Sequence, residues 1–215
     1  MGVDDTQPPA PAPPPKPAPK PAEQKVEAPP GPPDQAPPAD AVVPAYLAGL
    51  QQALPGAVEQ ISYWVGDWAV IVGRARLLEV CRYLRDTPDA AFDFCSDVTA
   101  SDWPARSARF DVVICLYSTI RRHRVRVKVR ATADEAVPSV SGLWPAANWL
   151  EREVFDMFGI RFDGHPDLRR ILMPEEWQGH PQRKDYPLEG PGELLLEDPL
   201  DWLRLRNARR TAEIE

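Results

Sequence analysis

The sequence lacks the short motifs that mark most catalytic and cofactor-binding chains. It has no GxxxxGK phosphate loop, no GxGxxG dinucleotide fingerprint and no GxSxG nucleophile turn. Cysteine is scarce, because only Cys81, Cys95 and Cys115 are present, in apolar or strand-like contexts and without a CxxC pair. An iron–sulfur cluster needs a full set of suitably spaced thiolates. These absences argue against a nucleotide-binding, hydrolytic or cluster-bearing chain, and we expect reduced, buried thiols.

Long hydrophobic runs are missing as well. The longest strongly apolar run extends only from Val112 to Tyr117, whereas a membrane-spanning helix needs about 18 or more apolar residues. The first residues lack the apolar core of a signal peptide. We therefore expect a water-soluble, intracellular chain that can still belong to a membrane assembly. Its net charge of −7 makes it a poor general binder of nucleic acid, because backbone phosphates attract cations.

Proline, in contrast, is abundant and unevenly distributed. Of the 27 prolines, 15 fall between Pro8 and Pro38, in a stretch without aromatic residues. Such a segment cannot bury enough apolar surface to offset the entropy of ordering it. We expect residues 1–40 to form a disordered Pro/Ala-rich extension with polyproline II character, which serves as a tether or as a docking arm.

Residues 41–159 carry the periodicities of a folded domain. Apolar residues at helical spacing predict helices that begin at Pro44 and at Arg74. Alternating residues predict strands over 58–64, 68–72, 92–98, 110–117 and 125–130, with a type II′ turn at Gly66-Asp67. Helices followed by hairpin-type strands indicate an α+β domain, a small mixed two-layer unit with a mainly antiparallel sheet.

A third helix, with Pro145 in its first turn and Gly159 past its end, is both apolar and densely charged. Buried charges are costly unless they are paired. Arg152 and Asp156 are four residues apart and are expected to pair with each other. Glu151 and Glu153 then need cations from elsewhere, and arginines follow in the next segment.

Regular patterns end after Gly159. We expect residues 160–215 to form an extended partner-binding arm, with a short helix from Asp198 onward. The helix and the arm should interlock with each other or with a second chain.

Two further features leave alternatives open. His165 and His180 each stand in a Gly-His-Pro triplet near carboxylates, which admits a metal-dependent hydrolase. Their separation of fifteen residues is unlike the short spacing of metal motifs, and an interface histidine fits better. The basic alternation from Arg121 to Arg130 needs only a solvated or partner-facing sheet, since no aromatic residues alternate with it to stack nucleic-acid bases.

The charged helix and the arm also carry a resemblance to a known family. The pattern Glu-Arg-Glu-x-x-Asp-Met-Phe at 151–158, followed by His165, Arg169 and Ile171-Leu172, resembles the signature of the C subunit of proton-pumping NADH:quinone oxidoreductase, respiratory complex I. A second block, Gly-His-Pro-x-Arg-Lys-Asp-Tyr-Pro-Leu at 179–188, is similar to that family too. Segments 98–104 and 137–149 also fit, so that the resemblance covers roughly residues 42–190.

The resemblance implies a non-catalytic structural subunit of the peripheral arm of the complex. Flavin, iron–sulfur clusters and quinone would lie on partner subunits, with no cofactor and no metal on this chain. The D and B subunits would be its partners, and it would meet NADH, quinone and the cytoplasmic side of the cell membrane only through the complex. Partner-binding or structural roles would fall to Glu151, Arg152, Glu153, Asp156, Gly159, His165, Pro166, Arg169, Arg170, Gly179, His180, Pro181, Arg183, Lys184 and Asp185.

The same residues leave a close alternative open. The equivalent subunit of a membrane-bound hydrogenase, or of another quinone-linked dehydrogenase, would have a similar signature.

Overall fold

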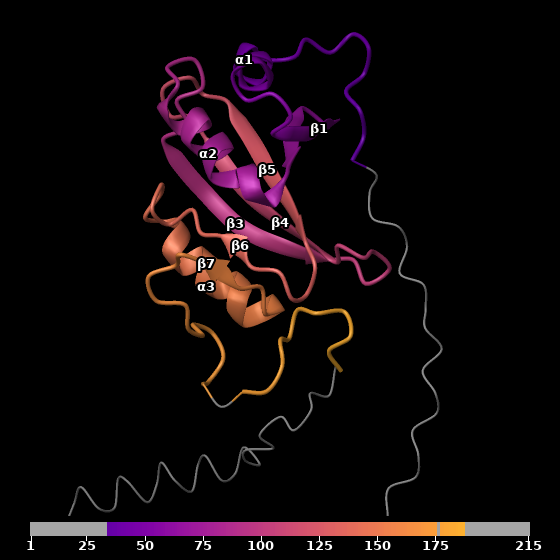
Figure 1. Cartoon of the computed structure of the whole chain (residues 1–215), viewed down its shortest axis with the longest axis vertical. Helices are drawn as coiled ribbons and strands as arrows, with labels where there is room; N and C mark the ends of the chain where they lie inside the picture. The colour runs from indigo at the N-terminus through magenta and orange to yellow at the C-terminus, as the bar shows by residue number, and fades with distance from the viewer. Residues whose placement is uncertain (1–33, 176, 188–215) are drawn as a thin grey trace, which may run out of the picture.

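A five-stranded sheet forms the centre of the computed structural model, which describes residues 34–175 and 177–187 (Figure 1). The second and third strands in spatial order, β2 and β5, are parallel, and all other neighbours are antiparallel. The spatial order is β1 (Val58–Trp64), β2 (Asp67–Val72), β5 (Arg124–Ala131), β4 (Phe110–Tyr117) and β3 (Phe94–Asp102). The sequence-based prediction of an α+β fold with a mainly antiparallel sheet is confirmed.

The parallel pairing of β2 with β5 decides where the turns lie. It brings the β1–β2 and β4–β5 turns to one end of the sheet, which we call the hairpin end, together with the start of β3. The β3–β4 turn lies at the opposite end, which we call the arm end because the C-terminal arm packs there. These two ends carry different chemistry.

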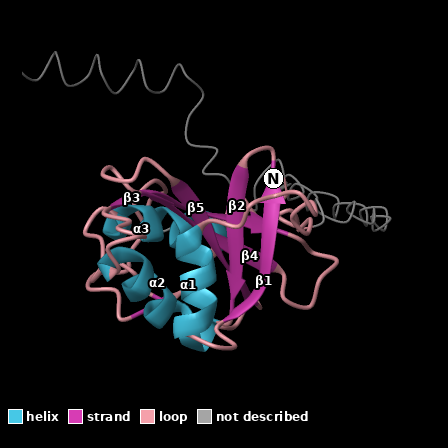
Figure 2. Cartoon of the chain, turned by 90° about the horizontal axis from the view of Figure 1, so that it is seen from above, coloured by secondary structure: helices cyan, strands magenta, loops and turns pink. Residues whose placement is uncertain are grey.

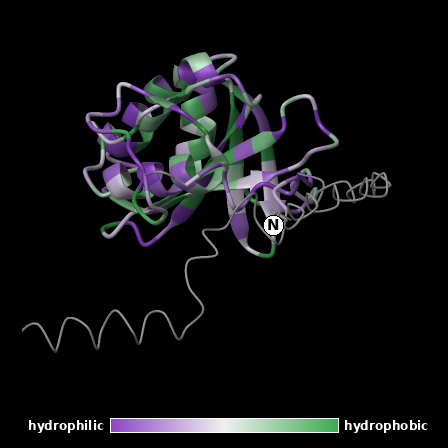
Figure 3. Ribbon diagram, turned by 90° about the horizontal axis from the view of Figure 1, so that it is seen from below, coloured by the Kyte–Doolittle hydropathy of each residue, from purple (hydrophilic) through white to green (hydrophobic). Residues whose placement is uncertain are grey.

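Helices α1 (Ala45–Ala53), α2 (Leu77–Asp86) and α3 (Ala147–Phe158) lie on one side of the sheet (Figure 2). A short 3₁₀ turn, Arg74–Arg76, begins the second of them, where the sequence predicts one continuous helix. The valines of β5 are at most 1% exposed and join one apolar cluster with Leu47 and Leu84. Figure 3 shows hydrophobic residues concentrated between the helices and the sheet. Burial of this area is the main driving force for the fold.

Two local predictions at the hairpin end are wrong. Trp64 pairs with Asp67, so that the turn residues are Val65 and Gly66, both with positive φ. Positive φ at both central positions defines a type I′ turn, which matches strand twist, rather than the expected type II′ turn. The third strand begins at Phe94, because Phe92 instead packs into the core against Tyr46.

The other face of the sheet carries the basic residues of β5. Lys128 Nζ and Arg130 Nη2 both form ion pairs with Asp34, at 2.7 Å each. The Asp34 backbone carbonyl also accepts a hydrogen bond from Gln60. Residues just before Ala41 therefore contact the sheet, whereas the composition places them in the extension. The limits of the extension stay a prediction, since residues 1–33 lie outside the described part.

The helix α3 ends as the sequence predicts, at Gly159, which has a φ of 74° and closes the helix in the left-handed conformation. It begins at Ala147, so that Ala146 is the N-cap and Pro145 precedes the helix instead of lying in its first turn. Beyond Gly159, β7 (Phe162–Asp163) pairs in parallel with β6 (Val137–Pro138). The arm then returns along α3, so the helix and the arm interlock within one chain. The helix expected from Asp198 lies outside the described residues.

The three cysteines are free thiols in the structure. Cys81 and Cys95 are buried and Cys115 is half-buried, and none forms a disulfide. Burial raises the pKa of the Cys95 thiol to about 12, which keeps it protonated and unreactive. In the described part of the chain, no helix combines the length and apolar character needed to cross a membrane.

Candidate functional site

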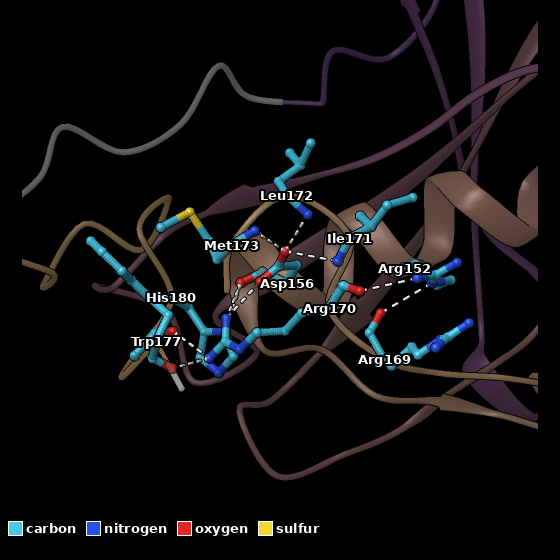
Figure 4. A network of polar contacts seen from close by, with 10 residues as sticks. Arg152, Asp156, Arg169, Arg170, Ile171, Leu172, Met173, Trp177 and His180 are labelled. Carbon is cyan, nitrogen blue, oxygen red and sulfur yellow. Dashed lines mark hydrogen bonds and ion pairs between the residues drawn. The ribbon is translucent and has the colours of Figure 1, made fainter. Parts of the chain in front are cut away.

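The carboxylate of Asp156, near the end of α3, is the centre of a polar network with the arm (Figure 4). Its Oδ2 accepts hydrogen bonds from three consecutive backbone N–H groups, those of Ile171, Leu172 and Met173, at 3.0, 2.8 and 2.8 Å. Its Oδ1 pairs with Arg170 Nη1 at 2.5 Å. The Asp156 side chain is fully buried. Four consecutive residues of the arm, 170–173, thus all bind one carboxylate.

The Arg170 guanidinium extends this network. Its Nη2 donates to the backbone carbonyls of Trp177 and Gly179, at 2.9 Å each, and so ties two further parts of the arm to α3. Burial by itself would raise the pKa of Asp156, but the hydrogen bond from Met173, the Arg170 guanidinium and the two other N–H groups together lower it. The carboxylate is therefore ionised at neutral pH, and its partners already occupy both oxygens.

Arg152 does not pair with Asp156, and the expected i,i+4 ion pair is wrong. Its Nε and Nη2 instead donate to the backbone carbonyls of Arg169 and Arg170, at 3.1 and 3.0 Å (Figure 4). Three of the four donors that the arm supplies to Asp156 are backbone N–H groups, which lose no side-chain entropy on binding, and Arg152 binds carbonyl oxygens instead. Glu153 is exposed, and among the described residues it forms no ion pair.

Glu151 is fully buried but does not meet the arginine expected for it. Its Oε1 accepts from the Val140 N–H at 2.7 Å and its Oε2 from the Ser139 hydroxyl at 2.6 Å. The nearest cationisable group is His165, whose Nε2 lies 4.0 Å away. Burial raises the pKa of the Glu151 carboxyl, because hydrogen bonds from neutral donors only partly replace hydration.

His165 is a structural connector between α3 and the arm. Its Nδ1 accepts the Asp167 N–H at 3.0 Å, so that Nε2 carries the hydrogen and donates to the Asn148 carbonyl at 3.0 Å. Pro166, which follows it, is exposed. Arg169 pairs with Asp167 at the surface, at 2.9 Å. The first Gly-His-Pro triplet thus anchors the beginning of the arm to the start of α3.

The second triplet closes the opposite end of α3. His180 donates through Nδ1 to the Asp156 carbonyl at 2.9 Å, and Arg183 donates to the Phe158 carbonyl at 2.5 Å. These are orphan carbonyls of a helix C-terminus, which need such partners. A Cβ on Gly159 would lie 2.5 Å from both side chains, so only glycine fits here. Burial lowers the pKa of His180, which favours the neutral ring. The half-buried Pro181 connects His180 to the Arg183 turn.

Arg109, which joins the arm to the sheet, has no signal in the sequence. It binds Asp102 through Nε and Nη2, at 2.6 Å each, and Asp185 through Nη1 and Nη2, at 2.8 and 2.7 Å. The Asp102 side chain is fully buried and also accepts the Lys184 N–H at 2.8 Å. These two carboxylates raise the pKa of Arg109. Its partner Asp185 lies 76 residues away in sequence, which is why no local pattern shows the pair.

The two histidines of the hydrolase alternative do not converge. His165 binds a carbonyl at the start of α3 and His180 binds one near its end. Within 34–175 and 177–187, no group of three or more His, Cys, Asp or Glu side chains is arranged to hold a metal ion. The charged groups at the arm end instead connect the arm to α3 and to the sheet of the same chain.

Comparison with known proteins identifies the family. The family described as "Respiratory-chain NADH dehydrogenase, 30 Kd subunit" matches residues 70–192. The chain belongs to this family. The matched residues include α3, Arg109 and the described arm, so the whole network at the arm end lies inside the family's own segment. The resemblance of residues 151–188 to the complex I C subunit is confirmed.

Relatives and a solved structure agree with this family. The C subunit of the NADH-quinone oxidoreductase of Caulobacter sp. (strain K31) is 48% identical over 158 residues, which cover 72% of this chain and 74% of the relative. Its counterpart from Roseiflexus castenholzii is 49% identical over 146 residues, with 67% and 84% covered. A chain of the membrane-bound sulfane sulfur reductase, an archaeal respiratory membrane complex, has the same fold at 24% identity (TM-score 0.56, 66% and 84% covered).

Proposed function

We propose that this chain is a non-catalytic structural subunit of an NADH:quinone oxidoreductase, with α3 and the arm docked on the D subunit near the quinone site. It would carry no flavin, cluster or quinone, and its neighbours, the D and B subunits among them, would do so. Through them it would support electron transfer coupled to proton translocation. It would reach the cytoplasmic face of the cell membrane as a peripheral part of the complex.

The bonding of the buried charges is the observation that carries this proposal. A catalytic carboxylate needs a free lone pair and a pKa matched to its task. Asp156 has a lowered pKa and four donors on its oxygens, and Asp102 is bound by Arg109 and by a backbone N–H. These groups are committed to holding an irregular segment in a fixed shape. Such an arrangement preorganises a surface, which lowers the entropy lost on association.

Two exposed apolar side chains indicate which side of this unit meets the partner. Trp149, on α3, is 69% exposed, and Leu172, in the arm, is 60% exposed. Arg152 lies one turn after the first and binds the carbonyl of Arg170 near the second. Tryptophan and arginine are the residues most enriched at energetically dominant interface positions. We therefore place the contact with the D subunit on the face with Trp149, Arg152 and Leu172.

The test compares assembly with turnover in cells that express a tagged full-length chain. Trp149→Ser and Leu172→Ser should reduce the amount of assembled complex on native gels. Any complex that does assemble should keep near-normal NADH:quinone reductase activity per particle, because a docking residue does not touch the reacting atoms. Gln52→Ser, at an exposed position of α1, is the matched control and should change neither quantity.

Two outcomes would contradict the proposal. Normal assembly with lost quinone reduction would place these residues in the chemistry. Co-purification with a hydrogenase module and no NADH-oxidising module would assign the chain to a related membrane complex instead. Oxidation of NADH by an artificial acceptor should persist in the detached module, and this activity shows that the variant cells still make the rest of the enzyme.

A further inference from the structure

Large apolar side chains are exposed together at the hairpin end, far from the arm. Trp64 and Val65, at the β1–β2 turn, are 57% and 83% exposed, and Ile120, in the β4–β5 turn, is 75% exposed. Phe94, at the start of β3, is 49% exposed. The sheet register places all of them at one end, because Phe94 pairs with Tyr117 beside these turns. Exposed apolar residues that gather in this way mark interaction sites.

The backbone at this end is strained. Three residues other than glycine have positive φ in the described part of the chain, namely Val65 at 47°, Ala91 at 45° and Arg122 at 56°. All three lie at the hairpin end. Ala91 is placed there because Asp93, two residues later, accepts hydrogen bonds from Thr119 of the β4–β5 turn. A β-branched residue is especially costly in this conformation. Strain that the surrounding structure maintains is typical of functional surfaces.

Charge at the hairpin end is incompletely balanced. Arg121 pairs with Asp89 across the surface, at 3.4 Å. Arg122 and Arg124 are exposed, and within the described residues neither forms an ion pair. Both line a hollow of about 470 Å³ between the two turns, together with Val65. The hairpin end thus presents apolar side chains next to two uncompensated positive charges.

We propose that the hairpin end is a second docking surface, which receives an acidic, apolar-centred surface of another protein subunit. This proposal rests on the proposed function for the existence of a larger complex, but not on the contact made by the arm. Arg122 and Arg124 would pair with carboxylates at the rim of the contact, and Val65 and Ile120 would be buried at its centre. The chain would then connect two neighbours, one at each end of its sheet.

The mixture of charges favours a protein over a lipid surface. Recognition of anionic lipid takes clusters of about 4–8 Lys or Arg. Here the β4–β5 turn also contacts two carboxylates, Asp89 through Arg121 and Asp93 through Thr119, which an anionic membrane would repel. Protein interfaces use such interspersed charges to fix orientation and partner. A rigid, strained turn is also better suited to a partner of fixed shape than to a fluid one.

Two variants of the full-length tagged chain test the proposal in the assembled complex. Val65→Asn/Ile120→Asn removes the apolar centre, and because asparagine tolerates positive φ it also relieves strain at residue 65. Arg122→Glu/Arg124→Glu reverses the uncompensated charge. Each should lower the fraction of chains retained in the complex at least about tenfold, without lowering the melting temperature of the free chain. The matched control, Arg82→Glu, is exposed on α2 and should be retained normally.

A photo-crosslinking residue at position 120 identifies the partner in the purified complex. A covalent product with an acidic segment of another subunit supports the proposal. Products with lipid, with residues of the same chain, or no product at all would overturn it, and so would full retention of both variants. Failure of the proposed function differs from these results, because then the wild-type chain itself would not be retained by the NADH:quinone complex.

Discussion

The two ends of the sheet use charge and backbone in opposite ways. At the arm end, buried carboxylates are fully bound, and an irregular segment is fixed by Asp156, Arg170 and Arg109. At the hairpin end, the turns are regular but strained, apolar side chains are exposed, and two arginines form no ion pair with described residues. The arrangement at the arm end stabilises the folded chain through contacts within it. The groups at the hairpin end lack such contacts with described residues and are free to bind a partner.

Removal of the Asp156 carboxylate should cause the largest loss of stability and detach the arm from α3. Asp156→Ala leaves Arg170 without its carboxylate partner and three backbone N–H groups without an acceptor, which should destabilise the chain by about 3–5 kcal/mol. The measurement is denaturant unfolding of the full chain, with limited proteolysis between residues 160 and 187. Asp167→Ala removes an exposed carboxylate of the same arm and should change the unfolding midpoint little. Equal midpoints for the two variants would contradict the role given to the network.

A comparison of two glycines sharpens the role of the second Gly-His-Pro triplet. Gly159 and Gly56 have nearly equal φ, 74° and 73°, but only at Gly159 would a Cβ meet His180 and Arg183, whereas at Gly56 it meets nothing within 4 Å. Gly56→Ala should cost only the backbone term of about 1–2 kcal/mol. Gly159→Ala should cost more, about 2–4 kcal/mol, since overpacking adds to that term. Thermal unfolding measures both.

The pH dependence of stability separates the two buried carboxylates. The folded-state pKa of Asp156 is lowered, so its contribution is present above about pH 4, the unfolded value, and is lost as pH falls through the folded value. That of Glu151 is raised, so its contribution is present below about pH 4 and is lost as pH rises through the folded value. Stability relative to wild type should therefore fall with rising pH for Asp156→Asn and rise for Glu151→Gln. Parallel profiles from pH 3 to 8 would contradict this assignment.

The smallest expected effect has the opposite sign and belongs to the hairpin end. Val65→Asn should stabilise the free chain, by about 1 kcal/mol or less, because asparagine adopts positive φ at lower cost. The measurement is thermal unfolding of the full chain. The same replacement at an exposed residue of β1 with ordinary φ, Glu59→Asn, should not stabilise it. A lower melting temperature for Val65→Asn would mean that its side chain supports the fold rather than a docking surface.

Much of the fold was predictable because it depends on local patterns. The alternation of valine and basic residues over 124–130 gave β5, and Gly159 gave the end of α3. The pairing of charges was not predictable in the same way. An arginine four residues from an aspartate suggests a pair, but Arg152 binds carbonyls and Asp156 binds the arm, because a loop distant in sequence brings better donors. Arg109 had no local signal at all.

The sequence by itself determined the α+β class, the limits of most elements and the membership of the 30 Kd subunit family, which an ordered set of motifs makes recognisable. Only the tertiary structure decided that the arm folds back on its own helix, that Glu151 accepts hydrogen bonds from hydroxyl and amide donors instead of pairing with an arginine, and that the strained turns meet at one end. The physical reason is the range of the interactions. Periodicity reports which face of an element is buried, whereas ion pairs and turn neighbours depend on which strands lie side by side, here on the parallel pairing of β2 with β5.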